Sequence, residues 1–511
     1  MKSGHVLLCG SPGWKRQPNR MKEPSRSEEA GMKLCKKGCP GCRLDEINKT
    51  KTGIPYLNFC YIWIVCLCST LPIHSLFPYL YFMIRDLKVA KQEQDIGFFA
   101  GFVGATYFLA RTITAVPWGM FADKYGRKPC IVISILSVII FNTLFGLSTT
   151  YWMAIVTRGL LGLLCGILGP IKAYASEVCR TEHQALGISL VTSSRAIAFV
   201  IGPAIGGFLS QPAKNYPNIF SEKSIFGRFP YFLPSFAISV LAAGACVACI
   251  WLPETLHMHH DDNVEAIDTM EAQVVDPNIV NVKGIQSRLG RFASTMSLLK
   301  NWQLMSAITL YCVFSLYDTA YIEIFSLWAV SSRKYRGLNF TSEDVGTVLA
   351  ISGIGIFVYQ LVVYPFLAKY AGLIKPFLAN YPTIQIFLVL YAYVYYRKVR
   401  REVGVKALIF FKPKSYANML ATITTACNIL QNTVVRQEQR GVANGISVTL
   451  MSIFKAVGPA AAGVLFSWAQ KNTTGLFLPG DQILFIFLNM VAIIGLLMTF
   501  KPFFSLPSAT K

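Results

Sequence analysis

The chain has 511 residues and a formal net charge of +22; 53% of its residues are hydrophobic and only 14% are charged. Soluble globular proteins carry about 25% charged residues, and the mean hydropathy here is +0.45, so an ordinary soluble enzyme is excluded. The basic residues lie in short clusters between long apolar runs, which is typical of membrane proteins and not of nucleic-acid-binding faces.

The N-terminal tail, residues 1–58, is expected to stay in the cytosol. Met1–Lys51 is polar and basic and contains no apolar signal-peptide core. Several of the 14 cysteines lie inside apolar runs, among them Cys60, Cys66 and Cys68. The cysteine pattern is therefore not that of a secreted disulfide scaffold.

Long apolar runs predict twelve membrane-spanning helices, since one span needs about 20 predominantly apolar residues. A first half, 59–252, is predicted to hold spans at 60–83, 96–121, 130–148, 152–173, 186–209 and 230–252. A polar cytosolic loop follows at 253–301. A second half, 302–504, is predicted to hold spans at 303–330, 345–368, 374–396, 415–435, 442–468 and 482–504, before a tail at 505–511. The predicted fold class is an all-α integral membrane protein with two six-helix pseudo-repeats.

The distribution of lysine and arginine predicts that both termini lie in the cytosol, because the segments on that side are the more basic. One stretch contradicts this rule. Residues 391–414 carry seven basic residues and are expected on the outer side.

The two halves share a short sequence pattern that indicates an internal duplication. Arg180 precedes a Gly-Pro pair at Gly202 by 22 residues, and Arg436 precedes a Gly-Pro pair at Gly458 by the same spacing. A Gly-Ile-Ser triplet lies between them in both halves. Secondary transporters use such repeats to build a central site that opens alternately to each side.

The loop expected after the second span, at 118–129, contains Gly119, Asp123, Gly126 and Arg127. Gly126 permits a tight turn, and Asp123 can pair with Arg127 at a helix end. This motif resembles the signature loop of the major facilitator superfamily. The resemblance implies that the charge pair helps to latch the two halves in one conformation.

Two further motifs resemble that superfamily. Arg158 lies within the fourth predicted span, like the buried arginine of proton-coupled members, and residues 194–207 resemble the fifth-span motif of antiporters. Glycine permits close helix approach and proline weakens the helix, so gating and simple packing both remain open as roles. The candidate gating residues are Gly119, Asp123, Gly126, Arg127, Gly202, Pro203, Gly206, Gly207, Gly458 and Pro459.

A narrower resemblance rests on three local features. These are the cysteine cluster at 35–42, the segment 177–180 and the segment 253–260, which begins Pro-Glu-Thr-Leu and continues into a histidine cluster. Together they are similar to the zinc-induced facilitator family of plants. The resemblance implies transport of metal chelators such as nicotianamine or phytosiderophores, with effects on zinc, potassium or auxin handling.

One segment departs from that family. Pro376 and Arg436 are 60 residues apart, whereas the corresponding Pro129 and Arg180 are 51 apart. The longer spacing includes the basic stretch 391–414. Transport competence therefore depends on whether the ninth and tenth spans form around it.

Ionisable residues inside predicted spans are candidates for function, because a charge in a bilayer is costly. Glu323 or Asp318 is predicted to be the proton-coupling carboxylate; five residues apart on one helix, the two do not share a face. Arg111 and Arg158 are predicted to hold substrate carboxylates or to tune that group. A structural ion pair is the alternative. Further candidates are Arg195 and His74, while Lys172 and Lys455 serve snorkelling as readily as substrate contact.

A metal-ligating role is a weaker hypothesis for two clusters that are expected in the cytosol. Thiolate ligands suit zinc, and histidine completes many such sites. The candidate ligands are Cys35, Cys39, Cys42, His257, His259 and His260. The alternative is a tail whose cysteines bind nothing.

No catalytic motif is present, so an enzyme is not expected. The resemblance to the superfamily implies a monomeric, proton-coupled antiporter that needs no bound cofactor. Its expected partners are a small-molecule substrate, protons and the lipid bilayer, with no nucleic acid. The expected cargo is a metal chelator, exported from the cytosol across the vacuolar or plasma membrane. The alternatives are a multidrug, organic-ion or potassium–proton antiporter, and a non-transporting sensor.

Overall fold

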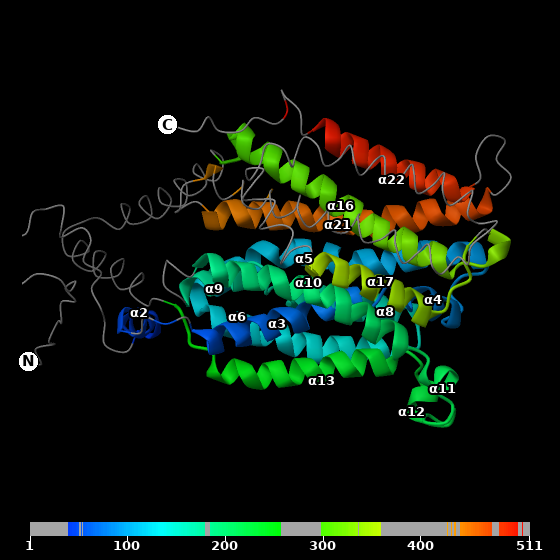
Figure 1. Cartoon of the computed structure of the whole chain (residues 1–511), viewed down its shortest axis with the longest axis horizontal. Coiled ribbons are helices and arrows are strands. Elements are labelled where there is room, and N and C mark those ends of the chain that lie inside the picture. Colours follow the sequence, from blue (N-terminus) through cyan, green and yellow to red (C-terminus); the bar gives the residue numbers. More distant parts are fainter. Residues whose placement is uncertain are drawn as a thin grey trace, which may run out of the picture.

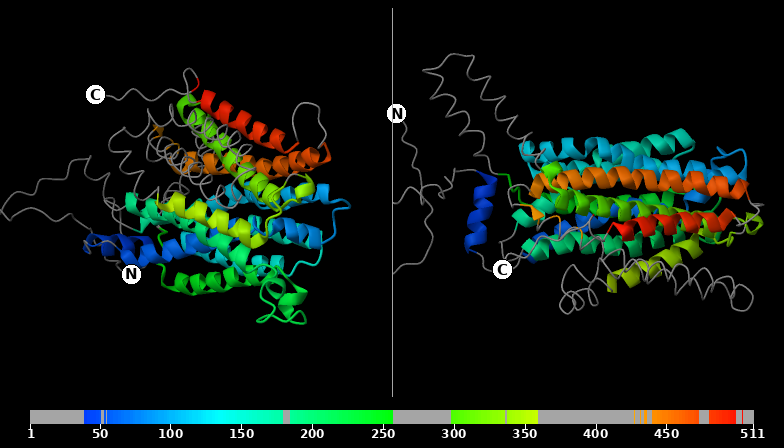
Figure 2. Two further views of the ribbon diagram at one scale, coloured as in Figure 1. Left: turned by 45° about the vertical axis from the view of Figure 1, so that its right-hand side comes forward. Right: turned by 90° about the horizontal axis from the view of Figure 1, so that it is seen from above.

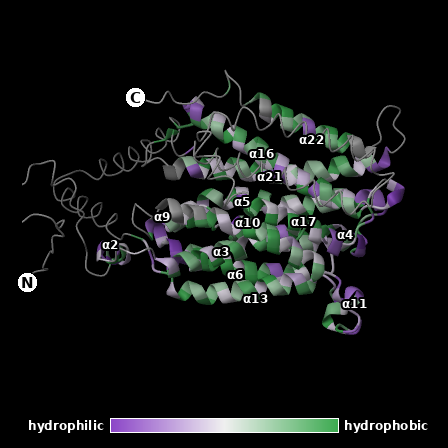
Figure 3. Ribbon diagram, viewed as in Figure 1, coloured by the Kyte–Doolittle hydropathy of each residue, from purple (hydrophilic) through white to green (hydrophobic). Residues whose placement is uncertain are grey.

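The fold is a bundle of long helices that lie side by side (Figure 1). A computed structural model describes residues 39–50, 53, 55–178, 184–256, 298–335, 337–358, 440–472 and 480–498, together with residues 427, 431, 434, 435 and 503. Every regular element in these ranges is a helix. Apolar residues cover the long helices, and hydrophilic residues gather toward the ends of the bundle (Figure 3). Such a pattern suits a bilayer-spanning protein.

The first half of the chain supplies one side of the bundle. Its helices are α3 (Tyr56–His74), α4 (Leu80–Asp86), η1 (Glu93–Asp95), α5 (Ile96–Tyr125), α6 (Arg127–Ser137), the π-helical η2 (Val138–Asn142), α7 (Thr143–Gly146), α8 (Tyr151–Leu164), α9 (Pro170–Glu177), α10 (Gln184–Phe208), α11 (Pro212–Asn215), α12 (Ile225–Arg228), α13 (Phe232–Ala248) and η4 (Cys249–Trp251). The short helix α2 (Pro40–Thr50) lies beyond one end of the bundle and crosses its direction in the view from above (Figure 2).

The described part of the second half contains α16 (Trp302–Val330), η5 (Arg333–Tyr335), α17 (Ser342–Val358), α21 (Arg440–Lys471) and α22 (Gly480–Leu497). We call the end of the bundle at which Gly126 joins α5 to α6 the Gly126 end, and the opposite end, where α4 lies, the α4 end. One cluster of buried apolar residues connects the halves near the α4 end and includes Met83, Ile324 and Phe466.

Six helices in the described ranges are long and apolar enough to cross a membrane. They correspond to the predicted first, second, third, sixth, seventh and eleventh spans: Tyr56–His74, Glu93–Tyr125, Arg127–Gly146, Phe232–Trp251, Trp302–Val330 and Ala443–Lys471. Shorter apolar helices match the fourth, fifth and twelfth spans. The predicted spans at 374–396 and 415–435, and the basic stretch 391–414, lie almost entirely outside the described residues.

Two predicted spans are interrupted, which the apolar runs did not indicate. The first span contains Pro72 and stops being α-helical after His74, and α4 begins at Leu80 beyond Pro78. The fourth span stops at Leu164 and resumes as α9 at Pro170. Proline removes a backbone donor and glycine is a weak helix former, so hydropathy stays continuous while the helix does not.

The loop predicted at 118–129 is much shorter in the structure. Helix α5 continues through Tyr125 and α6 begins at Arg127, so Gly126 alone separates them. Gly126 has a φ of +110°, a conformation that residues with a Cβ adopt only at a cost. The signature motif is therefore two helix ends around one glycine.

Glycine residues bring the two halves into backbone contact toward the α4 end. On α5 and α21, Gly101 faces Gly463, and on α10 and α17, Gly207 faces Gly346. The Phe98 amide donates to Ser467 Oγ at 2.8 Å, and Ser210 Oγ lies 2.9 Å from Ser342 Oγ. The halves are thus joined at this end by two helix pairs.

We predict that Gly101→Ala lowers stability, because its Cβ would lie 2.9 Å from Gly463 Cα and closer still to the Pro459 carbonyl oxygen. Overpacking of this kind costs about 1–3 kcal/mol. Thermal unfolding of the purified protein measures the effect. The control is Gly244→Ala on α13, where the new Cβ meets open space and helix propensity favours alanine. Equal melting temperatures for the two variants would contradict the packing described here.

Candidate functional site

The break in the first span creates a polar position in the middle of the bundle. Pro72 and His74 end α3, and the carbonyl oxygen of Pro72 accepts a hydrogen bond from Arg158 Nη1 at 3.0 Å. Gly202 and Gly206 of α10 pack against this break, where a Cβ on Gly202 would lie 2.8 Å from His74 Cβ. These two motif glycines therefore seat α10 on the interrupted helix.

Arg158 is held on α8 by neighbours of several kinds. It is 2% exposed, and its guanidinium lies over the rings of Phe145 at 5.2 Å and Tyr107 at 5.6 Å. It also interacts electrostatically with Glu323. Because one of its N–H groups bonds to Pro72, Arg158 is tied to the first half and faces a carboxylate of the second.

Glu323 is the most deeply buried carboxylate in the described ranges, with 1% exposure. It projects from α16 to where α5 and α21 meet. A Cβ on Gly104 would lie 3.3 Å from Glu323 Oε2 and 3.1 Å from Pro459 Cβ. Neither carboxylate oxygen has a hydrogen-bond partner among the described residues. A buried carboxyl group without a donor, beside an arginine, is suited to accepting and releasing a proton.

Asp318 lies on a different side of α16, as the five-residue spacing predicted. Arg195 Nη2 on α10 is 3.6 Å from Asp318 Oδ2. Lys455 on α21 interacts electrostatically with Asp318, Arg195 and Arg111. Asp318 and Glu323 thus have separate cationic neighbours.

Four of the six predicted proton and substrate residues form two pairs, Glu323 with Arg158 and Asp318 with Arg195. Arg111 is electrostatically coupled to Lys455 beside the second pair. The sixth residue is His74. Its ring lies 3.9 Å from that of Phe199, and it is electrostatically coupled to Arg195 and Lys455. Sequence reasoning left Lys455 undecided between snorkelling and substrate contact, yet Lys455 is only 8% exposed. Its position at the midpoint of the predicted 442–468 span was the signal against snorkelling, since a lysine there is far from either interface.

The candidate gating residues lie in two places, at contacts between packed helices and around the turn at Gly126. Gly207 packs across the halves on α17, and Gly458 packs on α16 against Leu316 and Thr319. A Cβ on Gly119 would meet no described atom within 4 Å, so no packing role is evident for it there. The remaining group surrounds the turn at Gly126.

A network of charges fixes that turn. Arg127 pairs with Asp123, as predicted, and Arg127 Nη2 also lies 3.3 Å from Glu177 Oε1. Thr255 Oγ1 donates to Glu177 Oε2 at 2.6 Å. All these residues belong to the first half or to the segment directly after it, so among the described residues this network does not join the halves.

Glu254 caps the start of α6 from a distant part of the chain. Its carboxylate accepts from the backbone amides of Arg127 and Lys128, both at 3.0 Å, and from those of Thr255 and Leu256. The amides of Arg127 and Lys128 lie at the N-terminus of α6, where backbone amides have no partner within their own helix. The other two amides belong to the residues that directly follow Glu254. Sequence reasoning used Glu254 only as a family marker; its separation of more than 120 residues from α6 gave no signal of the contact.

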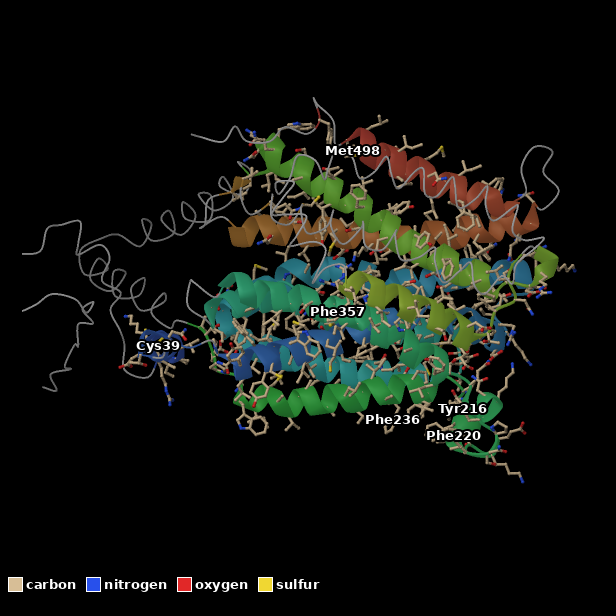
Figure 4. All side chains as sticks on the ribbon, viewed as in Figure 1. Cys39, Tyr216, Phe220, Phe236, Phe357 and Met498 are labelled. Atoms are coloured by element: carbon tan, nitrogen blue, oxygen red, sulfur yellow. The ribbon has the colours of Figure 1, made fainter. Side chains whose placement is uncertain are left out.

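The predicted metal ligands are only partly within the described residues. Cys35, His257, His259 and His260 lie outside them. Cys39 lies at the start of α2, outside the bundle, at the end opposite to Tyr216 and Phe220 (Figure 4). Its Sγ is 3.8 Å from the Leu256 carbonyl oxygen. Within the described ranges no group of three metal-ligating side chains occurs, so metal binding stays a prediction.

Comparison with known proteins shows which proteins this chain is similar to. Residues 62–398 match the Major Facilitator Superfamily. A "Probable peptide/nitrate transporter" of Arabidopsis thaliana is 50% identical over 484 residues, with 91% of this chain and 96% of that protein covered. The "Protein ZINC INDUCED FACILITATOR-LIKE 1" of the same plant is 47% identical over 467 residues, covering 91% and 95%. The crystal structure of a D-xylose–proton symporter superposes with a TM-score of 0.64 at 12% identity, covering 88% and 98%.

We predict that Glu254→Ala loosens the turn at Gly126, because four backbone amides lose their acceptor. Leaving such donors unpaired costs about 1–3 kcal/mol. Hydrogen–deuterium exchange at Arg127 and Lys128 measures the effect, and faster exchange is expected there. The control is Glu222→Ala, which removes an exposed carboxylate from the loop between α11 and α12. Unchanged exchange at Arg127 in the Glu254 variant would show that the cap is dispensable.

Proposed function

The chain belongs to the Major Facilitator Superfamily and to its zinc-induced facilitator-like branch, and from this premise we propose that it is a proton-coupled antiporter for a small organic anion that chelates metal. Members of this superfamily are membrane transporters and not enzymes. The finer points that we propose are the coupling to protons, the exchange mode and the cargo.

The observation that carries the proposal is the position of Glu323. Its carboxylate is buried where α5, α16 and α21 meet, close to Arg158 of the opposite half. A carboxylate in this position can alternate between a charged form that attracts Arg158 and a protonated form that does not. Protonation thereby changes how strongly the halves attract each other. Asp318 is less suited, because Arg195 already pairs with it.

The proposed direction of transport is export from the cytosol, and the proposed topology places the closed side of the bundle. With the N-terminus in the cytosol, as the positive-inside rule indicates, the Gly126 end faces the cytosol and the α4 end faces away from it. Contacts between the halves at Gly101–Gly463 and Gly207–Gly346 then close the outer side. Rocking of the halves would open that side and release cargo against an inward flow of protons.

The cargo is proposed by analogy together with local charge. The relatives named for zinc induction suggest a part in zinc homeostasis, for which a carboxylate-rich chelator such as nicotianamine is a suitable cargo. Arg111 and its cationic neighbours suit such an anion. Vacuolar and plasma membranes are both consistent with the proposed topology.

We predict that Glu323→Gln abolishes gradient-driven accumulation of labelled nicotianamine in proteoliposomes, since glutamine cannot exchange a proton. Counterflow without a pH gradient should persist, because this assay needs no net proton movement. The control is Glu222→Gln, an exposed carboxylate outside the bundle. Gradient-driven uptake by the folded Glu323 variant at the wild-type rate would refute the assignment. Gradient-independent uptake by the wild-type protein would instead favour a uniporter or another cargo.

A further inference from the structure

Three cations and one carboxylate form a second charge cluster between the halves. Arg111 on α5 and Lys455 on α21 are 4% and 8% exposed. Arg195 on α10 is 3.6 Å from Asp318 on α16. Lys455 interacts electrostatically with the other three. Two members of this cluster come from each half of the chain.

The cluster is not electrically balanced by the described residues. Glu323 has Arg158 as its electrostatic neighbour, which leaves Asp318 alone to compensate Arg111, Arg195 and Lys455. Lys455 Nζ lies over the ring of Phe108 at 5.8 Å and Arg195 over that of Phe199 at 5.9 Å. Such contacts compensate only part of the cost of burying the Lys455 ammonium group, whereas the Arg195 side chain is 36% exposed and stays partly solvated. The described residues thus leave a net positive charge here, which favours an anionic ligand.

We propose that Arg111, Arg195 and Lys455 form an anion-binding site, and that Asp318 is a resident counter-ion whose place a carboxylate of the ligand takes. The proposal rests on the proposed transport function for the ligand's chemical class. Three cations and one resident carboxylate leave room for more than one negative charge on the ligand, so the class that we propose is a small di- or tricarboxylate. Lys455 is the residue of this site that the second half contributes.

Asp318 makes the site selective for anions and also lowers the affinity with which it binds them. A neutral or cationic ligand gains nothing by displacing Asp318 from Arg195, whereas an anion restores the lost pairing. The resident carboxylate also competes with every anionic ligand. Its removal should therefore strengthen anion binding, which is opposite to the effect expected of a carboxylate that only stabilises the fold.

The test is isothermal titration of the purified full-length protein, reconstituted in lipid nanodiscs, with citrate, nicotianamine and tetraethylammonium. We expect Asp318→Asn to bind both anions at least tenfold more tightly than the wild type, and Lys455→Gln to bind them at least tenfold more weakly. Lys455→Arg should retain binding, since it keeps the charge. The control is Lys214→Gln on α11, at the α4 end of the bundle and outside the cluster.

Several results would overturn the proposal. These are wild-type affinity in Lys455→Gln, weaker anion binding in a monodisperse Asp318→Asn protein, or preference of the wild type for tetraethylammonium over both anions. The assay needs neither flux nor a pH gradient. Tighter anion binding by Asp318→Asn in a protein that fails to transport would therefore leave the site standing and reject only antiport. Gradient-driven transport together with unaltered anion binding in Lys455→Gln would reject the binding site and leave antiport standing.

Discussion

The close glycine contact between α5 and α21 is what the buried charges depend on. Gly101 meets Gly463 backbone to backbone, and Gly104, about one turn further along α5, leaves space for the Glu323 carboxylate. A side chain at Gly101 would push the helices apart, and one at Gly104 would crowd Pro459 and the Glu323 carboxylate. Arg158 contacts the same helix through Tyr107, so the packing of small residues on α5 helps to position both charged groups.

An interrupted helix positions the charged group of the first half, Arg158. A straight helix through Pro72 would keep its carbonyl groups within its own hydrogen-bond ladder, but the break after His74 exposes the Pro72 oxygen to Arg158. The Pro72 carbonyl oxygen thus gives Arg158 a hydrogen-bond acceptor, so that Arg158 needs no carboxylate besides Glu323. Gly202 and Gly206 close the other side of the same break. Motif residues in the fourth and fifth spans therefore serve one shared irregularity in the first span.

The sequence was sufficient for whatever depends on local pattern. Within the described residues, apolar runs predicted most spans to within a few residues, and the motif at 118–129 predicted that Asp123 pairs with Arg127 at a helix end. It was insufficient where partners are far apart in the chain. Glu254 and α6 are joined by tertiary packing of α13 beside α6, and the charged neighbours of Lys455 come from three other helices. Hydropathy also could not show that Pro72 and Pro170 interrupt spans whose apolar character is continuous.

The two ends of the bundle are stabilised in different ways, and this difference has a mechanical consequence. At the Gly126 end, the ties of Arg127, Glu177 and Glu254 lie within the first half and the segment that follows it. At the α4 end, Ser467, Ser342 and the glycine pairs tie one half to the other. A rocking motion can leave the first set intact as a rigid corner while it breaks only the second. An ion pair between Asp95 and Lys471 and a shared apolar cluster also join the halves at this end. Under the proposed mechanism, the change of charge at Glu323 therefore has to shift the balance between closed and open arrangements in which many such contacts form or break together.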